Sequence, residues 1–416
     1  MTALTDLTLI DVAARIRDGS ISSEEVTRAC LARIERIDPL INAFTKVEAD
    51  KALEQSRAAD KIRSAGGALP LLHGVPLAHK DMFYRAGQES ACGSAIRRGW
   101  KASTTADVLK RLDAAGSVTL GRLNMSEFAI GPIGLNAHYG PTRNPWNREH
   151  VSGGSSSGPG AAVASRLAFG ALGSDTGASI RVPAAACGIV GLKPSYGWIS
   201  TAGAMPLSGS LDVVGPLGRS VADVALLTAI LATPADERLT TPFHPAFYAA
   251  ATSPIETDRS VRIGVSKDYF ARDLHPEIEA NVEQSVRLFQ SLGYAVQSVD
   301  TSAFAEAAAL YLSIFGTEAA LFHAATFEER SQDYSPQIRA RLKLGRQIPR
   351  DQYEAALARR TQVLVRAQSD IFTKVDVLVA PVIGRPVPTI AEVDVGDGAN
   401  MSAVVGDFLR LTNPVN

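Results

Sequence analysis

"VSGGSSSGPGAAVAS", residues 151–165, is the stretch of this chain that says most about its fold and chemistry. Three consecutive serines, Ser155 to Ser157, lie between glycines and a proline, and small apolar residues follow at once. Such a stretch fits a flexible linker, a phosphate-binding loop or a catalytic loop. Flexible linkers usually separate domains. Core-like sequence lies on both sides here, so we expect the loop to interrupt a single domain.

The phosphate-binding interpretation fails at one position. A Walker loop needs GxxxxGK[ST], in which a lysine reaches the phosphates. Gly153 and Gly158 have the required spacing, but Pro159 stands where the lysine is needed. A backbone nest could still hold an anion, yet the incomplete motif argues against nucleotide binding.

A second stretch, "SDTGASIRVPAAACGIVGLKPSYG" (residues 174–197), places Ser179 among small residues. A serine on a tight turn of small residues allows backbone N–H groups to converge on a substrate carbonyl. A serine nucleophile also needs a base. Neither stretch contains a histidine, and the chain lacks the GxSxG elbow of an α/β-hydrolase triad.

Lysine is the remaining candidate base. "GVPLAHKDMFY" (residues 74–84) places Lys80 at the end of a predicted buried strand. Desolvation can lower a lysine pKa by up to roughly 3–5 units, and a neutral lysine can accept a proton from a serine. Taken alone, Lys80 also fits a structural lysine at a strand end.

Composition bounds the class of protein. With 416 residues, 46% hydrophobic and 20% charged, the chain is expected to be globular. Lys+Arg 42 against Asp+Glu 43 leaves no basic footprint for nonspecific nucleic-acid binding. The arginine-rich segment 339–366 fits a solvated helix face.

The cysteines and the apolar segments indicate in which cellular compartment the protein is expected. Three scattered cysteines favour neither a disulfide scaffold nor a zinc site, which fits a cytoplasmic protein. The N-terminus lacks the pattern of a signal peptide. No stretch has the roughly 18 uninterrupted apolar residues of a membrane-spanning helix.

Helical and strand patterns alternate along the chain. The first 60 residues favour helices, with capping-box spacing between Ser22 and Glu25. Later segments predict strands at "VPLAHKD", "GSVTLGRLN" and "RLAFGALGSDTG", a βαβ unit after residue 260, and a buried strand over 375–382. Such alternation predicts an α/β core with both faces of a sheet covered by helices.

Four stretches together resemble the amidase signature family: "LHGVPLAHKD", "HYGPTRNPW", "SGGSSSGPGAAVA" and "LGSDTGASIRVPAAACGIVGLKPSYG". The resemblance runs from about residue 9 to the end and is densest over 72–217. It implies one large domain over 1–416 with a central mixed, twisted β-sheet. The domain would comprise a helical N-terminal part (1–70), a catalytic core (71–232) and a remainder (233–416).

The resemblance also implies a Ser–cisSer–Lys triad. Ser179 would be the nucleophile, Ser155 the relay serine preceded by a cis peptide bond, and Lys80 the base. The oxyanion hole would be formed by the backbone N–H groups of Thr176, Gly177, Ala178 and Ser179. Three residues would support the site: Ser156, and Asp175 with Arg181 as a bracing ion pair. No metal or organic cofactor is expected.

Two departures from the family pattern stand out. Ala178 replaces the usual glycine before the nucleophile, and a Cβ restricts positive φ. The sequence given stops at "FLRLTNPVN", where the family usually continues. We therefore expect a C-terminal segment to be missing and the substrate pocket to be more open.

Three functions remain open. The chain could be an amidase cleaving a small C–N amide, with no partner beyond its substrate or with a second copy in a homodimer. It could be the A subunit of a glutamyl-tRNA(Gln) amidotransferase, which is a glutaminase that works with partner subunits and tRNA. It could also be a non-catalytic homologue. A membrane partner is not expected.

Overall fold

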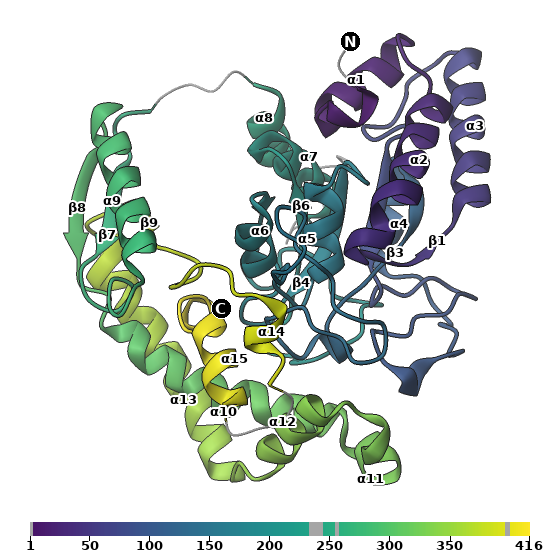
Figure 1. Ribbon diagram of the computed structural model, residues 1–416. Coiled ribbons are helices and arrows are strands. Elements are labelled where there is room, and N and C mark those ends of the chain that lie inside the picture. The colour runs from purple at the N-terminus through teal and green to yellow at the C-terminus, as the bar shows by residue number, and fades with distance from the viewer. Residues whose placement is uncertain (1–2, 233–243, 254–257, 396–399) are drawn as a thin grey trace.

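The computed structural model describes residues 3–232, 244–253, 258–395 and 400–416. A six-stranded mixed sheet, ordered β1-β3-β2-β4-β6-β5, forms its centre. In Figure 1 this sheet lies beside the purple N-terminal helices, and a second, smaller sheet lies at the opposite side of the molecule. The strands of the central sheet are β1 (Phe44–Val47), β2 (Pro76–Lys80), β3 (Val118–Leu123), β4 (Gly170–Asp175), β5 (Val190–Gly191) and β6 (Val213–Gly218). The α/β class and the mixed central sheet predicted from the sequence are confirmed.

Strand direction determines which loops meet. β2 runs parallel to both β3 and β4. Parallel strands end at the same edge of a sheet, so the ends of β2 and β4, Lys80 and Asp175, lie at one edge. β6 pairs with β4 in the antiparallel sense, with Val213 opposite Asp175. The residue that precedes β6 is therefore placed at the same edge.

Helices pack on the central sheet and on each other. α5, which begins at the last serine of the run, contacts β2, β3, β4 and β6, while α7 contacts β6 and β4. Most buried apolar residues join one continuous core. The helices are α1 (Leu9–Asp18), α2 (Ser23–Ile41), α3 (Ala49–Ala65), α4 (Asp107–Ala114), α5 (Ser157–Ala164), α6 (Arg181–Cys187), α7 (Val221–Leu231), α8 (Pro245–Thr252), α9 (Pro276–Ser291), α10 (Ala303–Phe322), α11 (Ala324–Arg330), α12 (Pro336–Arg346), α13 (Arg350–Ala367), α14 (Ile390–Val393) and α15 (Met401–Leu409).

The N-terminal part is not wholly helical. The capping box of Ser22 and Glu25 is present at the start of α2, as predicted. However, β1 follows α2 and pairs with β3 at the edge of the central sheet. The expectation that residues 1–70 are helical is therefore wrong at this four-residue strand.

A three-stranded parallel sheet, ordered β8-β7-β9, stands apart from the central one. Its strands are β7 (Arg262–Ser266), β8 (Ala295–Val299) and β9 (Val377–Val379). β7, α9 and β8 form the predicted βαβ unit. The predicted buried strand over 375–382 is shorter and more exposed than expected, because β9 is an edge strand of this small sheet. The predicted boundary after residue 232 falls at residues 233–243, outside the described part.

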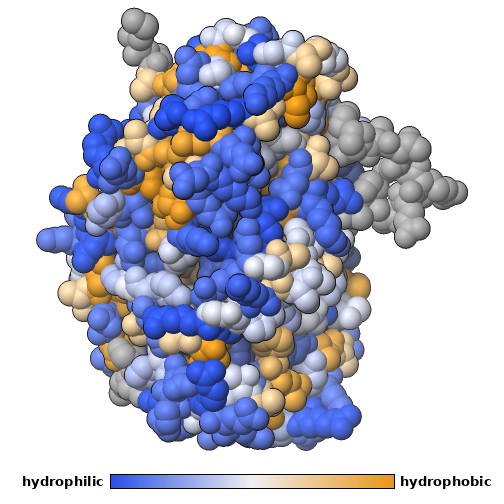
Figure 2. All heavy atoms as spheres, turned by 90° about the vertical axis from the view of Figure 1, so that its right-hand side faces the viewer, coloured by the Kyte–Doolittle hydropathy of each residue, from blue (hydrophilic) through white to orange (hydrophobic). Residues whose placement is uncertain are grey.

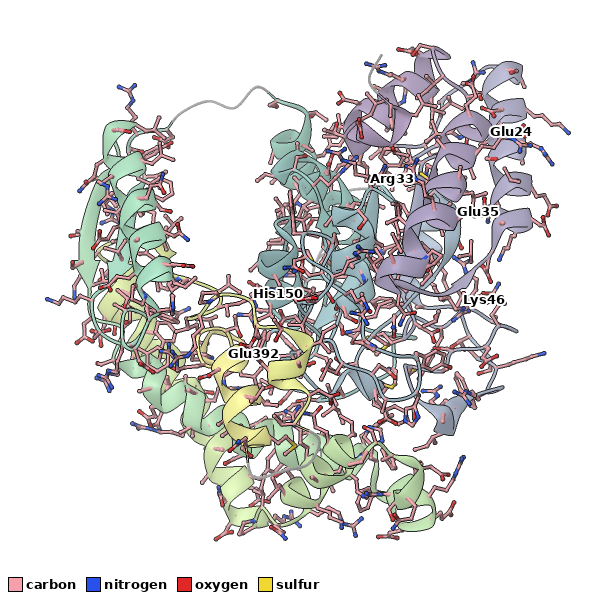
Figure 3. The ribbon with its side chains drawn as sticks, viewed as in Figure 1. Glu24, Arg33, Glu35, Lys46, His150 and Glu392 are labelled. Carbon is pink, nitrogen blue, oxygen red and sulfur yellow. The ribbon has the colours of Figure 1, made fainter. Side chains whose placement is uncertain are left out.

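Among the described residues, α10 and the chain around α14 are two of the places where the small sheet is joined to the central part. Tyr311 and Phe315 of α10 belong to the main core, while Phe304 at the start of α10 packs in a second cluster with Phe270 and Ile371. The second connection is the chain around α14. His150 Nδ1 lies 2.7 Å from Val387 O, and Figure 3 shows His150 next to Glu392.

α10 is long and apolar enough to cross a membrane by length and composition alone. Ile314 and Ala319 on this helix are nevertheless buried in the main core, and Glu318 is hydrogen-bonded to Ser208. These contacts are those of a core helix. Figure 2 shows the right-hand face of the molecule, where hydrophobic residues lie in separate patches between hydrophilic ones.

Candidate active site

Lys80 lies at the edge where β2 and β4 end, with only 1% of its surface exposed. Its Nζ donates to Ser155 Oγ at 2.7 Å and to Ser174 Oγ at 2.8 Å. The nitrogen therefore joins the serine-rich loop to the end of strand β4. Ser155 was predicted to be the partner of Lys80, but Ser174 was not.

Burial changes the acidity of this lysine. Desolvation lowers the pKa of Lys80 from 10.5 to about 7, and the nearby carboxylates of Asp175 and Asp212 partly oppose that shift. Because the neutral amine is the basic form, a substantial fraction of Lys80 can accept a proton near neutral pH.

The serine-rich loop is packed on all sides. The Gly154–Ser155 peptide bond is cis. Ser155 is fully buried, and its carbonyl accepts from the backbone N–H of Ser126 at 3.1 Å. A Cβ on Gly154 would lie 2.6 Å from the backbone nitrogen of Gly134, so only glycine fits there. The loop is thus a fixed part of the core and not a linker.

Asp175 organises the turn that carries Ser179. Its carboxylate accepts from the backbone N–H groups of Gly177 and Ile180, both at 3.0 Å. Arg181 forms the expected ion pair with it, Nη2 to Oδ1 at 2.8 Å. The Arg181 guanidinium and these hydrogen bonds outweigh desolvation and lower the pKa of Asp175 to about 2. A buried carboxylate with so many donors fixes the local backbone.

Ser179 is 8% exposed and lies on this turn. Its carbonyl accepts from the Ser156 N–H at 3.3 Å, while Ser156 Oγ donates to Ser174 O at the same distance. Hydrogen bonds of Ser156 therefore connect the serine-rich loop to the turn that carries Ser179 and to β4. Within the described residues the Ser179 hydroxyl has no hydrogen-bond partner, so the link between Ser155 and Ser179 stays a prediction.

The predicted oxyanion donors differ in their availability. The Gly177 N–H already donates to Asp175. Over the described ranges, the N–H groups of Thr176, Ala178 and Ser179 have no protein acceptor. Ala178 is not among the residues with positive φ, so its Cβ is tolerated there.

A cluster of aromatic residues and one arginine borders both loops. A Cβ on Gly177 would collide with the hydroxyl of Tyr311, so α10 directly contacts the turn that carries Ser179, which we call the nucleophile turn after its predicted role. Tyr311 stacks on Phe315 at 5.4 Å between ring centroids. The Arg341 guanidinium lies over the Phe315 ring at the same distance.

Arg341 approaches the serine-rich loop from α12. A Cβ on Gly131 would lie 3.9 Å from Arg341 Nη1, and a Cβ on Gly154 would lie 2.9 Å from Gly131 O. Arg341 Nη1 is buried without a partner, and no carboxylate of the described residues pairs with this arginine. The interpretation of segment 339–366 as a solvated face is wrong for Arg341, because its helix packs against α10.

Ser174 and Asp212 also contact the site and were not predicted from the sequence, like Tyr311, Arg341 and Asn416. Ser174 lay inside a predicted strand, where a serine carries no functional signal. Asp212 directly precedes β6, and its Oδ1 accepts from Thr176 Oγ1 at 2.6 Å. A signal for Asp212 would have required knowing that β6 pairs with β4.

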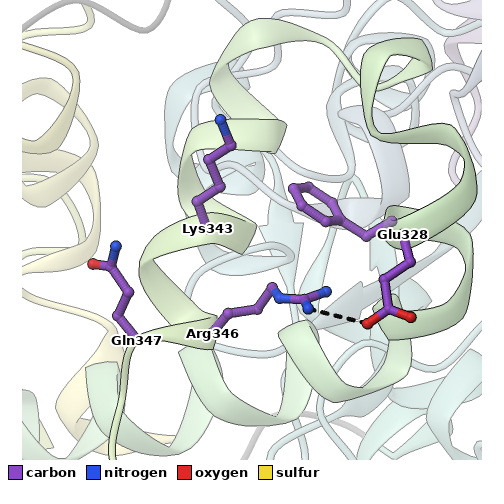
Figure 4. A pocket seen from close by; sticks show the side chains of 5 residues that line it. Glu328, Lys343, Arg346 and Gln347 are labelled. Atoms are coloured by element: carbon purple, nitrogen blue, oxygen red, sulfur yellow. Dashed lines mark hydrogen bonds and ion pairs between the residues drawn. The ribbon is translucent and has the colours of Figure 1, made fainter.

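Two hollows are lined by residues other than the predicted triad. A cavity of about 840 Å³ between the two sheets is lined by residues including Tyr311 and Arg181. A shallow surface hollow, shown in Figure 4, lies between α11 and α12, where Arg346 is paired with Glu328 at 3.1 Å. The described residues include no group of His, Cys, Asp and Glu able to hold a metal ion.

Comparison with known proteins identifies the class of this chain. Residues 25–416 match the family described as Amidase, so the chain belongs to the amidase family, whose members are hydrolases acting on C–N bonds. The chain is 38% identical to the A subunit of glutamyl-tRNA(Gln) amidotransferase from Pseudomonas syringae pv. syringae (strain B728a), over 91% of this chain and 83% of that protein. It is 37% identical to the corresponding protein from Roseiflexus sp. (strain RS-1), over 94% of this chain and 84% of that protein.

Comparison with solved structures finds the same fold in an amidase and in related proteins. A chain described under "An unexpected vestigial protein complex reveals the evolutionary origins of an s-triazine catabolic enzyme" has a TM-score of 0.88 and 33% identity, over 98% of this chain and 88% of that one. An amidase crystal structure gives a TM-score of 0.86 at 29% identity, over 98% and 89% of the two chains. 6-Aminohexanoate cyclic dimer hydrolase complexed with substrate gives 0.85 at 26%, over 99% and 88%.

Proposed function

We propose that this protein hydrolyses the C–N bond of a small amide through an acyl-enzyme on Ser179, with Ser155 and Lys80 as the proton relay. The observation that carries the proposal is the buried hydrogen bond of 2.7 Å between Lys80 Nζ and Ser155 Oγ. A lysine with a pKa of about 7 can act there as a base.

The steps follow from this arrangement. Neutral Lys80 takes the proton of Ser155 as Ser155 takes that of Ser179, and Ser179 Oγ attacks the amide carbon. The resulting oxyanion is stabilised by the N–H groups of Thr176, Ala178 and Ser179, and removal of one such donor typically costs about 3–4 kcal/mol in the barrier. The proton returns through Ser155 to the leaving amine, the C–N bond breaks, and water then hydrolyses the Ser179 ester by the same relay.

A second candidate function is favoured by Arg341. A partly buried arginine without a carboxylate partner is a binding group for an anionic substrate. Glutamine carries a carboxylate at one end and a primary amide at the other, and the curated relatives named above are amidotransferase A subunits. We therefore hold a glutaminase that works with partner subunits as the alternative.

Ammonia release by the purified chain tests these functions. The panel comprises neutral aliphatic amides and glutamine, with Ser179→Ala as the control. Turnover of neutral amides by the isolated chain supports the amidase. Turnover of glutamine that appears only when amidotransferase partner subunits and tRNA are added supports the alternative. If neither occurs and a serine-directed phosphonate labels nothing, the protein is a non-catalytic homologue and both proposals fail.

A further inference from the structure

Asp212 is held next to the nucleophile turn by sheet register. It precedes β6, and Val213 pairs with Asp175 at the end of β4. Its two carboxylate oxygens accept hydrogen bonds from two different segments. Oδ1 accepts from Thr176 Oγ1 at 2.6 Å, while Oδ2 accepts from the backbone N–H groups of Leu207 and Ser208 at 2.8 and 3.0 Å. A carboxylate that accepts this many hydrogen bonds is fixed in place.

The loop that carries Asp212 is also fixed from α10. Glu318 Oε1 accepts from Ser210 Oγ at 2.7 Å, and Glu318 Oε2 accepts from the Ser210 N–H at 3.1 Å and from Ser208 Oγ at 2.5 Å. Tyr353 adds a hydrogen bond to Glu318 at 2.9 Å. Two carboxylates with different surroundings therefore hold this loop: Asp212, which belongs to it, and Glu318, which reaches it from α10. Asp212 reaches the nucleophile turn, whereas Glu318 holds the loop from the helix behind it.

We propose that Asp212 is a positioning residue of the amide hydrolysis, which acts through the Thr176 hydroxyl to hold the oxyanion turn in its reactive geometry. The inference rests on the proposed function. Thr176 contributes a free N–H to the predicted oxyanion hole, and its side chain is anchored only by Asp212 among the described residues. The Thr176 carbonyl is held separately, because it accepts from Asn416 Nδ2 at 2.9 Å. Without the side-chain anchor the turn keeps only that contact at Thr176, so its N–H can shift, and misplaced donors stabilise an oxyanion poorly.

Because Asp212 is charged, its role can also be tested by the pH dependence of the reaction rate, which a purely structural role would not change. The titratable groups that act on Lys80 are the carboxylates of Asp175 and Asp212 and the thiol of Cys92. Both carboxylates favour the protonated lysine and therefore raise the pKa of Lys80. Removal of the Asp212 charge should lower the pKa of Lys80 and shift the acid limb of the rate profile to lower pH. Glu318 is not among these groups.

Four variants test the inference on an amide that the wild type hydrolyses: Asp212→Asn, Thr176→Val, Thr176→Ser and Glu318→Gln. Loss of a charge-assisted hydrogen bond predicts a fall in kcat of about tenfold to a hundredfold for Asp212→Asn, with KM changed less than about threefold. The acid limb should shift to lower pH in this variant. Thr176→Val should lower kcat without shifting the limb, because the Asp212 charge remains, and Thr176→Ser should restore kcat. Glu318→Gln is the matched control and should leave the limb in place.

Three outcomes overturn the inference alone: Thr176→Val with wild-type kcat, Thr176→Ser as impaired as Thr176→Val, or Asp212→Asn with an unshifted acid limb. If Asp212→Asn does not fold, the comparison of Thr176→Val with Thr176→Ser still tests the inference. A wild-type chain that neither hydrolyses amides nor reacts with a phosphonate overturns the proposed function instead, and the inference with it.

Discussion

Ser174 Oγ lies 2.8 Å from Lys80 Nζ, almost as close as Ser155 Oγ at 2.7 Å. The lysine nitrogen is thus held by two hydroxyls from two different segments. One of them, Ser155, belongs to the proposed proton relay. The other belongs to β4 and fixes where the nitrogen sits, so that its lone pair can be directed at Ser155.

We expect Ser174→Ala to lower kcat by about tenfold, the cost of one lost hydrogen bond to a partly charged group. KM should change little, since Ser174 is not expected to contact substrate. Ser174→Thr keeps the hydroxyl and is the matched control. Steady-state kinetics check the pair, and equal loss of activity in both variants would show that the hydroxyl is not what matters.

Replacement of Lys80 by methionine should lower kcat/KM by about a hundredfold to ten-thousandfold, the usual contribution of a general base. In the wild type, activity should rise with pH through about 7, because protonated Lys80 cannot accept a proton and its pKa lies near that value. A pH–rate profile checks the direction. A flat profile between pH 6 and 8, or a methionine variant within tenfold of wild type, would contradict the role of Lys80 as base.

Ser179→Ala should abolish amide hydrolysis and covalent labelling by a serine-directed phosphonate, since no other group in the proposed mechanism can form the acyl-enzyme. Mass spectrometry of the labelled, digested protein locates the adduct. Ser260→Ala, at an exposed serine, is the control and should react like wild type. An adduct that persists on the Ser179→Ala variant would assign the nucleophile elsewhere.

Arg341→Met should discriminate between substrates. If the unpaired guanidinium binds a carboxylate, KM for a carboxylate-bearing amide should rise about tenfold or more, while KM for a neutral amide of similar size should stay within about threefold. Arg341→Lys keeps the charge but not the planar fork and should fall in between. Equal effects on both substrates would mean that Arg341 is structural.

Asp175→Ala should destabilise the fold by about 3–5 kcal/mol, because it leaves Arg181 without its partly buried partner. The low pKa of Asp175, about 2 in the fold against 3.8 as the ordinary value, also predicts a pH dependence. Its contribution to stability is complete above pH 4 and is lost as the pH falls toward 2. Urea unfolding at pH 7 and pH 3 checks both statements; a wild-type chain equally stable at both values, relative to the alanine variant, would contradict them.

The resemblance to the amidase signature family named Lys80, Ser155 and Ser179 before any pairing of strands was known, because each lies in a motif that can be recognised from its own neighbours. The structure places Lys80 within hydrogen-bond distance of Ser155, while the roles of all three residues stay predictions. The Asp175–Arg181 ion pair is equally local, because it closes one turn.

The remaining contacts depend on pairing between distant segments. Asp212 meets Thr176 because β6 lies antiparallel to β4, and Arg341 reaches the site because α12 packs on α10. The absence of a partner for Arg341 Nη1 among the described residues is a property of its tertiary surroundings that no sequence pattern records. β1 and β9 were missed or misjudged for a related reason: both are short edge strands whose structure comes from a single neighbour.

α10 carries Tyr311 against the nucleophile turn and Glu318 against the loop of Asp212, while its first residues pack with the small sheet. In the proposed mechanism the reacting groups come from residues 80–179, whereas Tyr311 and Arg341, which border the same two loops, come from α10 and α12. On that proposal, substitutions on these two helices can change which amide binds while Lys80, Ser155 and Ser179 stay unchanged. A gene that acquired changes only there could be retuned to a new amide without disturbing the chemistry, and libraries restricted to α10 and α12 are the natural place to look for altered specificity.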